Sequence, residues 1–165
     1  MILTLILSFA GCVLLFLCIW GVTVTMPTPL LAKNFPVDVQ ECLKPRLESL
    51  PMSFIRVIGW IILVAFCVLY IGIFVFGAID GIANNYNFWQ FFLRFFLIGG
   101  IIKVFDIVCL DYVLLTKTHF FQHYFPETKD CIGWKKFGYN RKQQAGQCLA
   151  IAIMSPVLAF VCSLF

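Results

Sequence analysis

Charged residues are scarce in this sequence: they make up 12% of its 165 residues, while hydrophobic residues make up 62%. Soluble domains carry about 25% charged residues, so this shortage excludes an ordinary soluble domain. The alternation of polar and apolar residues that a membrane-spanning strand requires is lacking as well. What the chain does contain is a set of long apolar runs, which are typical of helices that cross a lipid bilayer.

Four of these runs reach or exceed the length of about 20 residues that a helix needs to cross the hydrocarbon core. They cover residues 2–26, 57–79, 88–115 and 145–165. We therefore predict an all-α protein, a four-span transmembrane helical bundle that forms a single integral membrane domain over residues 1–165. No Lys or Arg precedes the first run, and it is longer than the hydrophobic part of a signal peptide, so we expect a membrane span there.

The connections between the runs differ in charge. The loop over residues 116–144 carries six Lys and Arg residues against two acidic ones, the loop over residues 27–52 is balanced, and the connector over residues 80–87 has no basic residue. Lys and Arg close to span ends favour the cytoplasmic side. We therefore predict a multi-pass protein of the cell membrane with both loops in the cytoplasm and both termini outside. Residues 37–46 are expected to form a short packed connector.

The eight cysteines show no Cys-x-x-Cys spacing, which argues against a redox motif of that type and against a zinc knuckle. Six of them lie in predicted spans, where cysteine behaves as a small apolar residue. The other two, Cys42 and Cys131, lie in the predicted cytoplasmic loops, where thiols are kept reduced. With the opposite orientation in the membrane, these two residues would be candidates for a disulfide.

Three charged residues, Lys103, Asp106 and Asp111, interrupt the third apolar run. A charge at the bilayer centre costs about 2.5–3.5 kcal/mol on insertion scales, so such residues normally face a bundle interior or a water-filled cavity. At about 100° per residue of an α-helix, the two carboxylates lie on either side of Lys103 on one sector. These residues are the candidate polar site in the membrane, and Asp106 and Asp111 are the candidate catalytic groups.

Two interpretations of this polar site are open. The charges either neutralise one another and hold the helices together, or line a pocket that opens toward the cytoplasm and holds an ion, a proton or a lipid headgroup. Arg94, in the same run, is expected to extend its side chain to the outer surface. We interpret Gly77 and Gly81, which precede the run, as part of a turn rather than as a site of close helix packing.

Two histidines follow the third run. His119 and His123 are four residues apart and would share a helix face, and Glu127 comes shortly after them. Together they are candidates for a zinc site or another divalent metal site. Pro126 is expected to end the helix before Glu127, and interfacial histidines that stabilise a helix end are the simpler explanation. We therefore predict neither a metal nor a cofactor.

The stretch from residue 134 to residue 142 combines aromatic and basic residues. Each Lys or Arg near an anionic leaflet contributes about 1 kcal/mol of attraction, so this stretch is a candidate surface for lipid headgroups. Its basic members are Lys135, Lys136, Arg141 and Lys142. The positive-inside rule alone would also account for them.

Residues 105–141 contain three short motifs. They are Phe105-Asp106-x4-Asp111-Tyr112, the sequence Pro-Glu-Thr that begins at Pro126, and the sequence Phe-Gly-Tyr-Asn-Arg at residues 137–141. Together they resemble the motifs of a family of small multi-pass membrane proteins of bacteria. The resemblance implies a bacterial inner-membrane setting and no particular activity, and Lys103 lies outside its motifs.

Catalytic motifs are lacking: the sequence has no phosphate-binding glycine loop, no Gly-x-Ser-x-Gly and no His-Glu-x-x-His. We therefore favour a non-enzymatic accessory or interaction subunit over an enzyme. Its expected partners are membrane lipids and either another membrane protein or further copies of itself, and not nucleic acid. The alternatives are a membrane-embedded enzyme that acts on a lipid-like substrate at the cytoplasmic face, and a small oligomeric transporter that uses Lys103 and Asp106.

Overall fold

The computed structural model describes residues 1–25, 32–49 and 54–165. Within these residues the chain forms helices joined by turns, with no β-strand, so the predicted all-α fold is confirmed. The predicted end of the first span at residue 26 lies outside the described residues, as does part of the predicted loop over residues 27–52. The chain divides into two compact units.

Among the described residues, three α-helices are long and apolar enough to cross a membrane: α1 (Ile2–Thr25), α4 (Phe54–Ala83) and α7 (Arg141–Cys162). They correspond to the first, second and fourth predicted spans. The third predicted span is not one α-helix, because α5 (Phe88–Phe105) is followed directly by the π-helix η1 (Asp106–Lys117). The structure therefore supports three candidate spans by length and composition and does not by itself establish four.

Asparagines set the connection between α4 and α5. Asn87 caps α5, because its Oδ1 accepts a hydrogen bond from the backbone N–H of Gln90 at 3.0 Å, while the Oε1 of Gln90 accepts one from the backbone N–H of Asn87 at 2.9 Å. Asn85 follows the end of α4 with a φ of +51°, in the left-handed region that asparagine adopts more readily than most residues. The chain thus reverses direction at residues 84–87.

Gly77 and Gly81 lie inside α4, so the interpretation that they belong to the turn is wrong. A Cβ atom at Gly81 would collide with the ring of Phe91 on α5. The small residue is therefore needed for close approach of the two helices, as in other small-residue contacts between membrane helices. The asparagines, rather than the glycines, are the signal for the turn.

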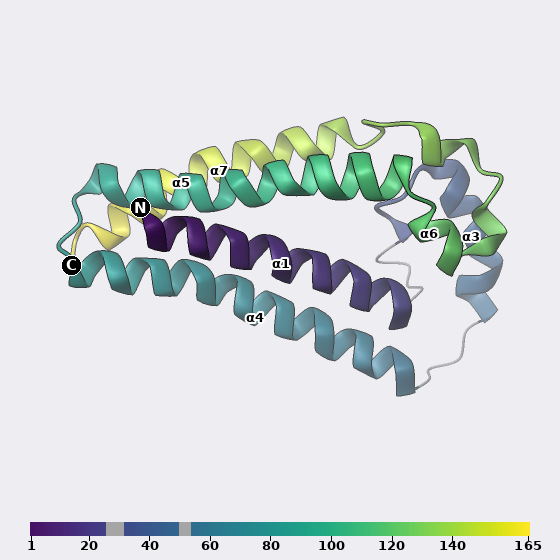
Figure 1. Cartoon of the computed structure of the whole chain (residues 1–165), viewed down its shortest axis with the longest axis horizontal. Helices are drawn as coiled ribbons and strands as arrows, with labels where there is room; N and C mark the ends of the chain where they lie inside the picture. Colours follow the sequence, from purple (N-terminus) through teal and green to yellow (C-terminus); the bar gives the residue numbers. More distant parts are fainter. Residues whose placement is uncertain (26–31, 50–53) are drawn as a thin grey trace. The chain divides into compact units, whose positions relative to one another are not determined.

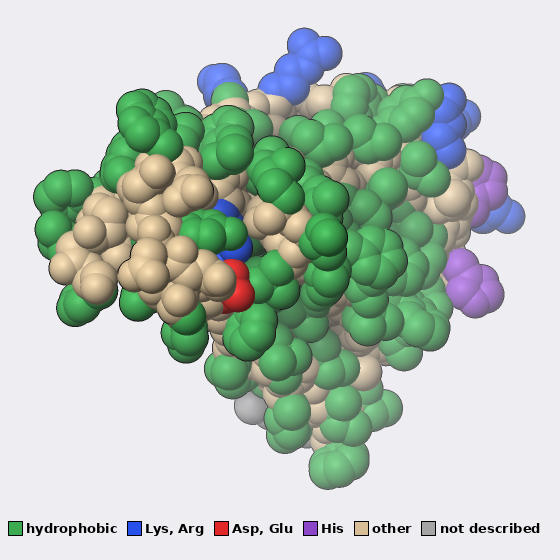
Figure 2. Space-filling model, turned by 60° about the vertical axis from the view of Figure 1, so that its left-hand side comes forward, with side chains coloured by type: hydrophobic (Ala, Val, Ile, Leu, Met, Phe, Trp, Pro, Cys, Tyr) green, Lys and Arg blue, Asp and Glu red, His purple; other side chains and the backbone are tan. Residues whose placement is uncertain are grey.

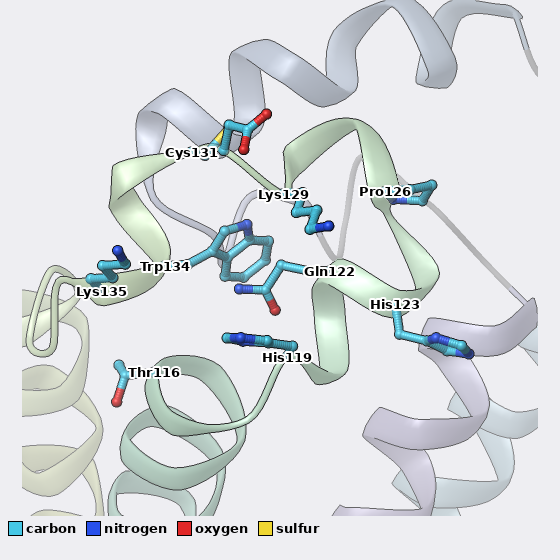
Figure 3. A pocket seen from close by; sticks show the side chains of 10 residues that line it. Thr116, His119, Gln122, His123, Pro126, Lys129, Cys131, Trp134 and Lys135 are labelled. Carbon is cyan, nitrogen blue, oxygen red and sulfur yellow. The ribbon is translucent and has the colours of Figure 1, made fainter.

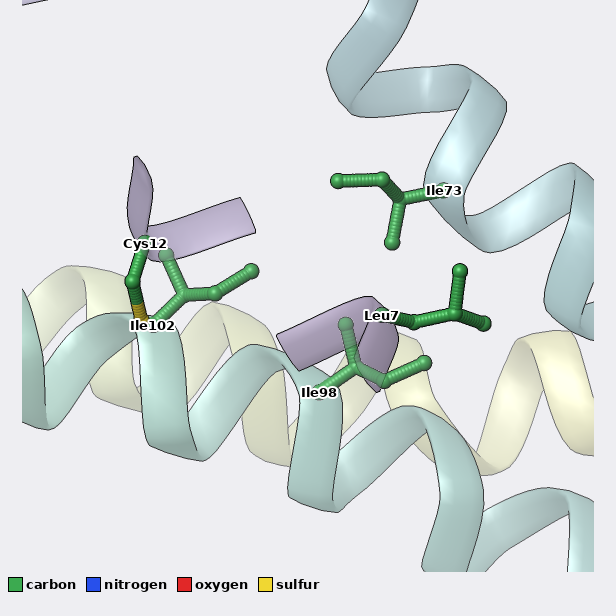
Figure 4. Packing of buried hydrophobic residues seen from close by; sticks show 5 residues of the cluster. All are labelled: Leu7, Cys12, Ile73, Ile98 and Ile102. Atoms are coloured by element: carbon green, nitrogen blue, oxygen red, sulfur yellow. The ribbon is translucent and has the colours of Figure 1, made fainter. Parts of the chain in front are cut away.

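The first unit contains Met1–Leu15, Phe66–Asp106 and Lys142–Phe165. Its central apolar cluster joins α1, α4 and α5 through Leu7, Cys12, Ile73, Ile98 and Ile102 (Figure 4). A second cluster brings in α7, because Ala159 packs with two phenylalanines of α5. Both termini lie at the same end of this unit as the connection between α4 and α5 (Figure 1).

Large apolar side chains remain exposed on the outer surface of the long helices. In the apolar 18-residue stretch of each of α4 and α7, only 11% of the residues are buried inside the protein. Hydrophobic side chains cover most of the face shown in Figure 2, and basic side chains lie mostly toward its margins. An apolar exterior of this kind is expected where lipid or another apolar surface is the surrounding medium.

The second unit contains Phe16–Ala65 and Ile107–Arg141. Within it, residues 32–49 and 119–136 pack together, and we call them the loop module. The module comprises α3 (Val37–Ser49), α6 (Phe120–Tyr124) and two short 3₁₀-helices, η2 (Pro126–Thr128) and η3 (Ile132–Lys135). Because α3 contacts both η2 and η3, residues from the two predicted cytoplasmic loops form one folded element.

An aromatic cluster forms the core of the loop module. The ring of Phe35 lies 5.0 Å, between centroids, from those of Phe121 and Trp134, and the rings of Phe121 and Trp134 stack on each other at 5.5 Å. Trp134 is 2% exposed, and its Nε1 donates to the carbonyl oxygen of Thr128 at 2.9 Å. The indole therefore buries its ring without leaving its N–H unpaired.

Polar contacts between α3 and the second loop complete the module. Asp38 Oδ2 accepts a hydrogen bond from the backbone N–H of Gly133 at 2.6 Å, and Arg46 pairs with Glu127 at 2.8 Å. A Cβ atom at position 133 would collide with the carboxylate of Asp38, so the first contact requires glycine. The expected packed connector over residues 37–46 is thus a helix that is held at both ends.

Candidate functional site

Lys103 is buried in the first unit, with 8% of its surface exposed. Its Nζ donates to Oδ2 of Asp106 at 2.6 Å and also to Oε1 of Gln147 on α7. The i,i+3 ion pair inferred from the sequence is present, and Gln147 is an additional acceptor that the sequence did not reveal. Because a buried ammonium group requires both a counter-charge and hydrogen-bond acceptors, this arrangement joins α5 to α7.

The backbone also brings α5 and α7 close together beside this pair. Gly99 lies four residues before Lys103, and a Cβ atom there would be 3.0 Å from Cγ2 of Ile151 on α7. A side chain at position 99 would hinder this approach of α5 and α7. Glycine there lets the two helices come close, so that the Lys103 side chain reaches its acceptor on α7.

Asp111 has a different partner. It lies in η1, in the second unit, and its Oδ2 accepts a hydrogen bond from Nδ2 of Asn140 at 2.9 Å. The prediction that two carboxylates flank Lys103 assumed α-helical geometry, but η1 follows the wider repeat of a π-helix from Asp106 onward. The structure therefore joins Lys103 to Asp106 and Asp111 to Asn140.

Arg94 does not extend to the outer surface, and that expectation is wrong. The residue is 3% exposed, and its Nη1 donates to the carbonyl oxygen of Gly77 and to Oδ2 of Asp80, each at 2.7 Å. Its Nη2 donates to the hydroxyl of Tyr86 at 2.8 Å, and the guanidinium lies 4.4 Å from the centre of that ring. These partners pair both terminal nitrogens of the guanidinium inside the protein, whereas its Nε, also buried, has no hydrogen-bond partner among the described residues.

A cavity of about 560 Å³ lies in the second unit, and all but one of its lining residues belong to the loop module. Both histidines line it, together with Gln122, Lys129 and Lys135 (Figure 3). The covered side-chain oxygen Oε1 of Gln122 finds no hydrogen-bond donor among the described residues. Burying an acceptor in this way is costly. Because this oxygen has almost no exposed surface, it is not itself available to a ligand in the cavity.

The two histidines do not converge on one point of the cavity. In Figure 3 the ring of His119 lies beneath Gln122, whereas His123 points away from it. Glu127, the third candidate ligand, is engaged by Arg46. Among the residues that the structure describes, no group of three or more His, Cys, Asp or Glu side chains could hold a metal ion.

The basic residues predicted to meet lipid headgroups lie in two settings. Lys135 lines the cavity, and the side chains of Lys136, Arg141 and Lys142 are exposed. Their contact with lipid headgroups stays a prediction. Lys129 was not among the predicted headgroup ligands, because the sequence alone does not show that α6, η2 and η3 fold around a common cavity.

Comparison with known proteins gives no relative: no protein-family model, no curated protein and no solved structure matches this chain. The resemblance to bacterial membrane proteins over residues 105–141, and with it a bacterial inner-membrane setting, stays a prediction.

Proposed function

We propose that this chain is a four-span integral membrane protein that acts as a non-enzymatic accessory or interaction subunit. The additional span in this proposal, the third in chain order, is the continuous helical segment formed by α5 and η1. Its two basic residues deepest in the protein, Arg94 and Lys103, are buried and paired, so the segment can cross the bilayer without presenting those charges to lipid.

The fold of the loop module supports the proposed topology. Residues from the loops 27–52 and 116–144 pack against each other, as two loops on the same side of a membrane can. The excess of basic residues in the second of these loops favours the cytoplasm for that side and the outside for the termini. We therefore propose a multi-pass location in the cell membrane.

The observation that carries the proposed role is that charged side chains of the third span form hydrogen bonds with other helices. Lys103 and Asp106 are joined to α7 through Gln147, and Arg94 joins α5 to the end of α4. Groups engaged in this way support the packing interpretation of the polar site. The extensive apolar surfaces of α4 and α7 then provide contact area for lipid or for a partner membrane protein.

Native mass spectrometry of the protein extracted with its own membrane lipids tests this proposal. We expect an oligomer of the chain or a complex with another membrane protein. A monomer that retains a lipid-like ligand or a metal, and loses it when Asp106, Asp111 or His123 is changed, would contradict the proposal. That result would instead establish a ligand-binding site near the end of the third span.

The double variant Lys103→Met/Asp106→Leu tests the packing interpretation directly. Replacing both members of a buried ion pair with apolar residues is often neutral, so we expect the variant to fold and to retain the wild-type assembly state. Lys103→Met alone leaves Asp106 without its counter-charge and is the matched control, expected to be less stable. A folded double variant that has lost its assembly or cellular role would refute the packing interpretation.

The cavity favours a second candidate function, that of an enzyme acting on a lipid-like substrate at the cytoplasmic face. Its lysines would attract an anionic headgroup, and His119 is placed to exchange a proton with a bound group. Turnover of phospholipid by the purified protein, abolished by His119→Ala or His123→Ala without loss of stability, would establish this function. Unchanged turnover in both variants would exclude it.

A further inference from the structure

Cys42 and Cys131 come together in the loop module although 89 residues separate them in the sequence. Their Sγ atoms lie 3.0 Å apart and share a hydrogen bond in which either can be the donor. A disulfide bond is about 2.05 Å long, so an approach of roughly 1 Å would allow the bond to form. No other cysteine lies in the loop module.

The surrounding fold holds the two sulfurs in place through contacts that do not involve sulfur. Asp38, Cys42 and Arg46 are spaced four residues apart, so they form one stripe along α3. The two residues that flank Cys42 on this stripe bind Gly133 and Glu127, and position 131 lies between these partners. The thiols are therefore positioned by a hydrogen bond on one side and an ion pair on the other.

The two thiols differ in accessibility. Cys42 is exposed, whereas Cys131 is partly buried. Burial, the hydrogen bond with Cys42 and the nearby charges of Cys42, Asp38 and Asp130 raise the pKa of Cys131 to about 12. Because the thiolate is the reactive form, an oxidant should react first with the exposed Cys42 and only then should Cys131 follow.

We propose that Cys42 and Cys131 form an oxidisable dithiol whose oxidant is a disulfide, either a small one such as glutathione disulfide or that of a thiol oxidoreductase. The Cys42 thiolate attacks one sulfur of the oxidant, whose disulfide breaks to release one thiol and leave a mixed disulfide. Cys131 then loses its proton to solvent and attacks Sγ of Cys42. This step releases the second thiol and forms the intrachain disulfide.

The exchange is balanced. The chain loses two hydrogen atoms, and the oxidant gains them as two thiols. The product joins α3 to the residue that precedes η3, so it crosslinks the two loops. Cys131 also lines the cavity, and closure of the disulfide would fix part of the cavity wall. This chemistry is independent of whether the chain is an interaction subunit.

Peptide mapping of the full-length wild-type protein tests the proposal. The reduced protein in detergent micelles is incubated with glutathione disulfide at mildly alkaline pH, alkylated and digested. We expect a linked pair of peptides that contain Cys42 and Cys131, lighter by two hydrogen atoms than the reduced pair and separated by a reductant. Because the crosslink closes a long loop, the oxidised protein should also melt at a higher temperature than the reduced protein.

Matched variants assign the bond. Cys148→Ser removes an exposed cysteine outside the loop module and should leave the linked peptides unchanged. Cys42→Ser should abolish them and leave Cys131 available for alkylation after unfolding. If glutathione instead stays attached to Cys42, or if wild-type oxidation links two chains or other cysteines, the proposal is overturned. The wild-type map decides the question even if a variant fails to fold.

Discussion

In the first unit the most deeply buried charged side chains are Arg94 and Lys103, and large apolar residues remain on the outside. The loop module has the opposite arrangement. Its centre is filled by aromatic rings, while charged residues such as Lys129, Asp130 and Lys136 are exposed. One short chain thus contains a region suited to lipid and a region suited to water.

Polar contacts therefore contribute differently to the stability of the two regions. In the first unit a buried charge is costly unless it is paired. Each polar contact therefore helps to determine which helices pack together. In the loop module the aromatic core supplies most of the burial, and surface ion pairs contribute little. Substitutions that act on one kind of contact at a time should separate the two cases.

The largest effect is expected in the alkylation rate of Cys131. Its pKa is raised to about 12, so the protonated thiol should persist well above the ordinary value of 9.0. We expect alkylation of Cys131 to accelerate about tenfold per pH unit through this range, because the thiolate reacts. Peptide-resolved alkylation between about pH 8 and pH 11, with unfolded protein as the control, measures the rate. A plateau near the ordinary value in the folded protein would show that burial and the neighbouring Cys42 do not raise the pKa of Cys131.

Trp134→Ala should destabilise the loop module by about 3–5 kcal/mol, as large-to-small changes of buried aromatic residues do. It removes the stacking with Phe121 and the hydrogen bond to Thr128. Limited proteolysis of the module, followed by mass spectrometry, reports the loss. Ile132→Ala is the matched control, because Ile132 is 69% exposed and lies in the same 3₁₀-helix. Equal sensitivity of the two variants would mean that the aromatic cluster does not stabilise the module.

Arg94→Met should destabilise the first unit by about 3 kcal/mol, near the lower end for breaking a buried ion pair, because Asp80 keeps some exposure. The variant leaves Asp80 and Tyr86 without their buried donor. Unfolding in mixed detergent micelles, followed by circular dichroism, measures the change. Arg94→Met/Asp80→Leu should recover part of the loss, and the exposed Lys142→Met should have little effect. A neutral Arg94→Met would show that these contacts do not hold α4 and α5 together.

Arg46→Met should have the smallest effect, below about 1 kcal/mol, as is usual for exposed ion pairs. The side chains of Arg46 and Glu127 are 37% and 30% exposed, so water screens their attraction. Melting of the loop module at low and high salt measures the change, and the difference between wild type and variant should shrink at high salt. A loss as large as that of Trp134→Ala would erase the contrast between the two regions.

Apolar run length predicted α1, α4 and α7, because a run of about 20 apolar residues is visible in the local sequence, whereas the third run continues after α5 as a π-helix. The pairing of Lys103 with Asp106 was also predictable, since it depends only on a spacing of three residues. Gln147 was not, because it is 44 residues away and nothing local indicates that α5 packs on α7 at that point.

The errors have related causes. Arg94 was expected to reach water because a single sequence does not show that Asp80 and Tyr86 turn back toward it. The position of Asp111 was derived from α-helical geometry, which the chain abandons at Asp106. The stripe of Asp38, Cys42 and Arg46 at intervals of four was visible in the sequence and could have indicated a face of α3 that binds another segment.

The π-helix η1 bears on how the chain tolerates changes in length. In an α-helix, deleting one residue rotates everything that follows by about 100° and disrupts every later contact. A π-helix holds more residues per turn, so a deletion there can be absorbed when one turn returns to the α-helical ladder. The segment from Asp106 to Lys117 is therefore a point at which homologous chains could differ by a single-residue gap while α5 and its buried charges stay in register.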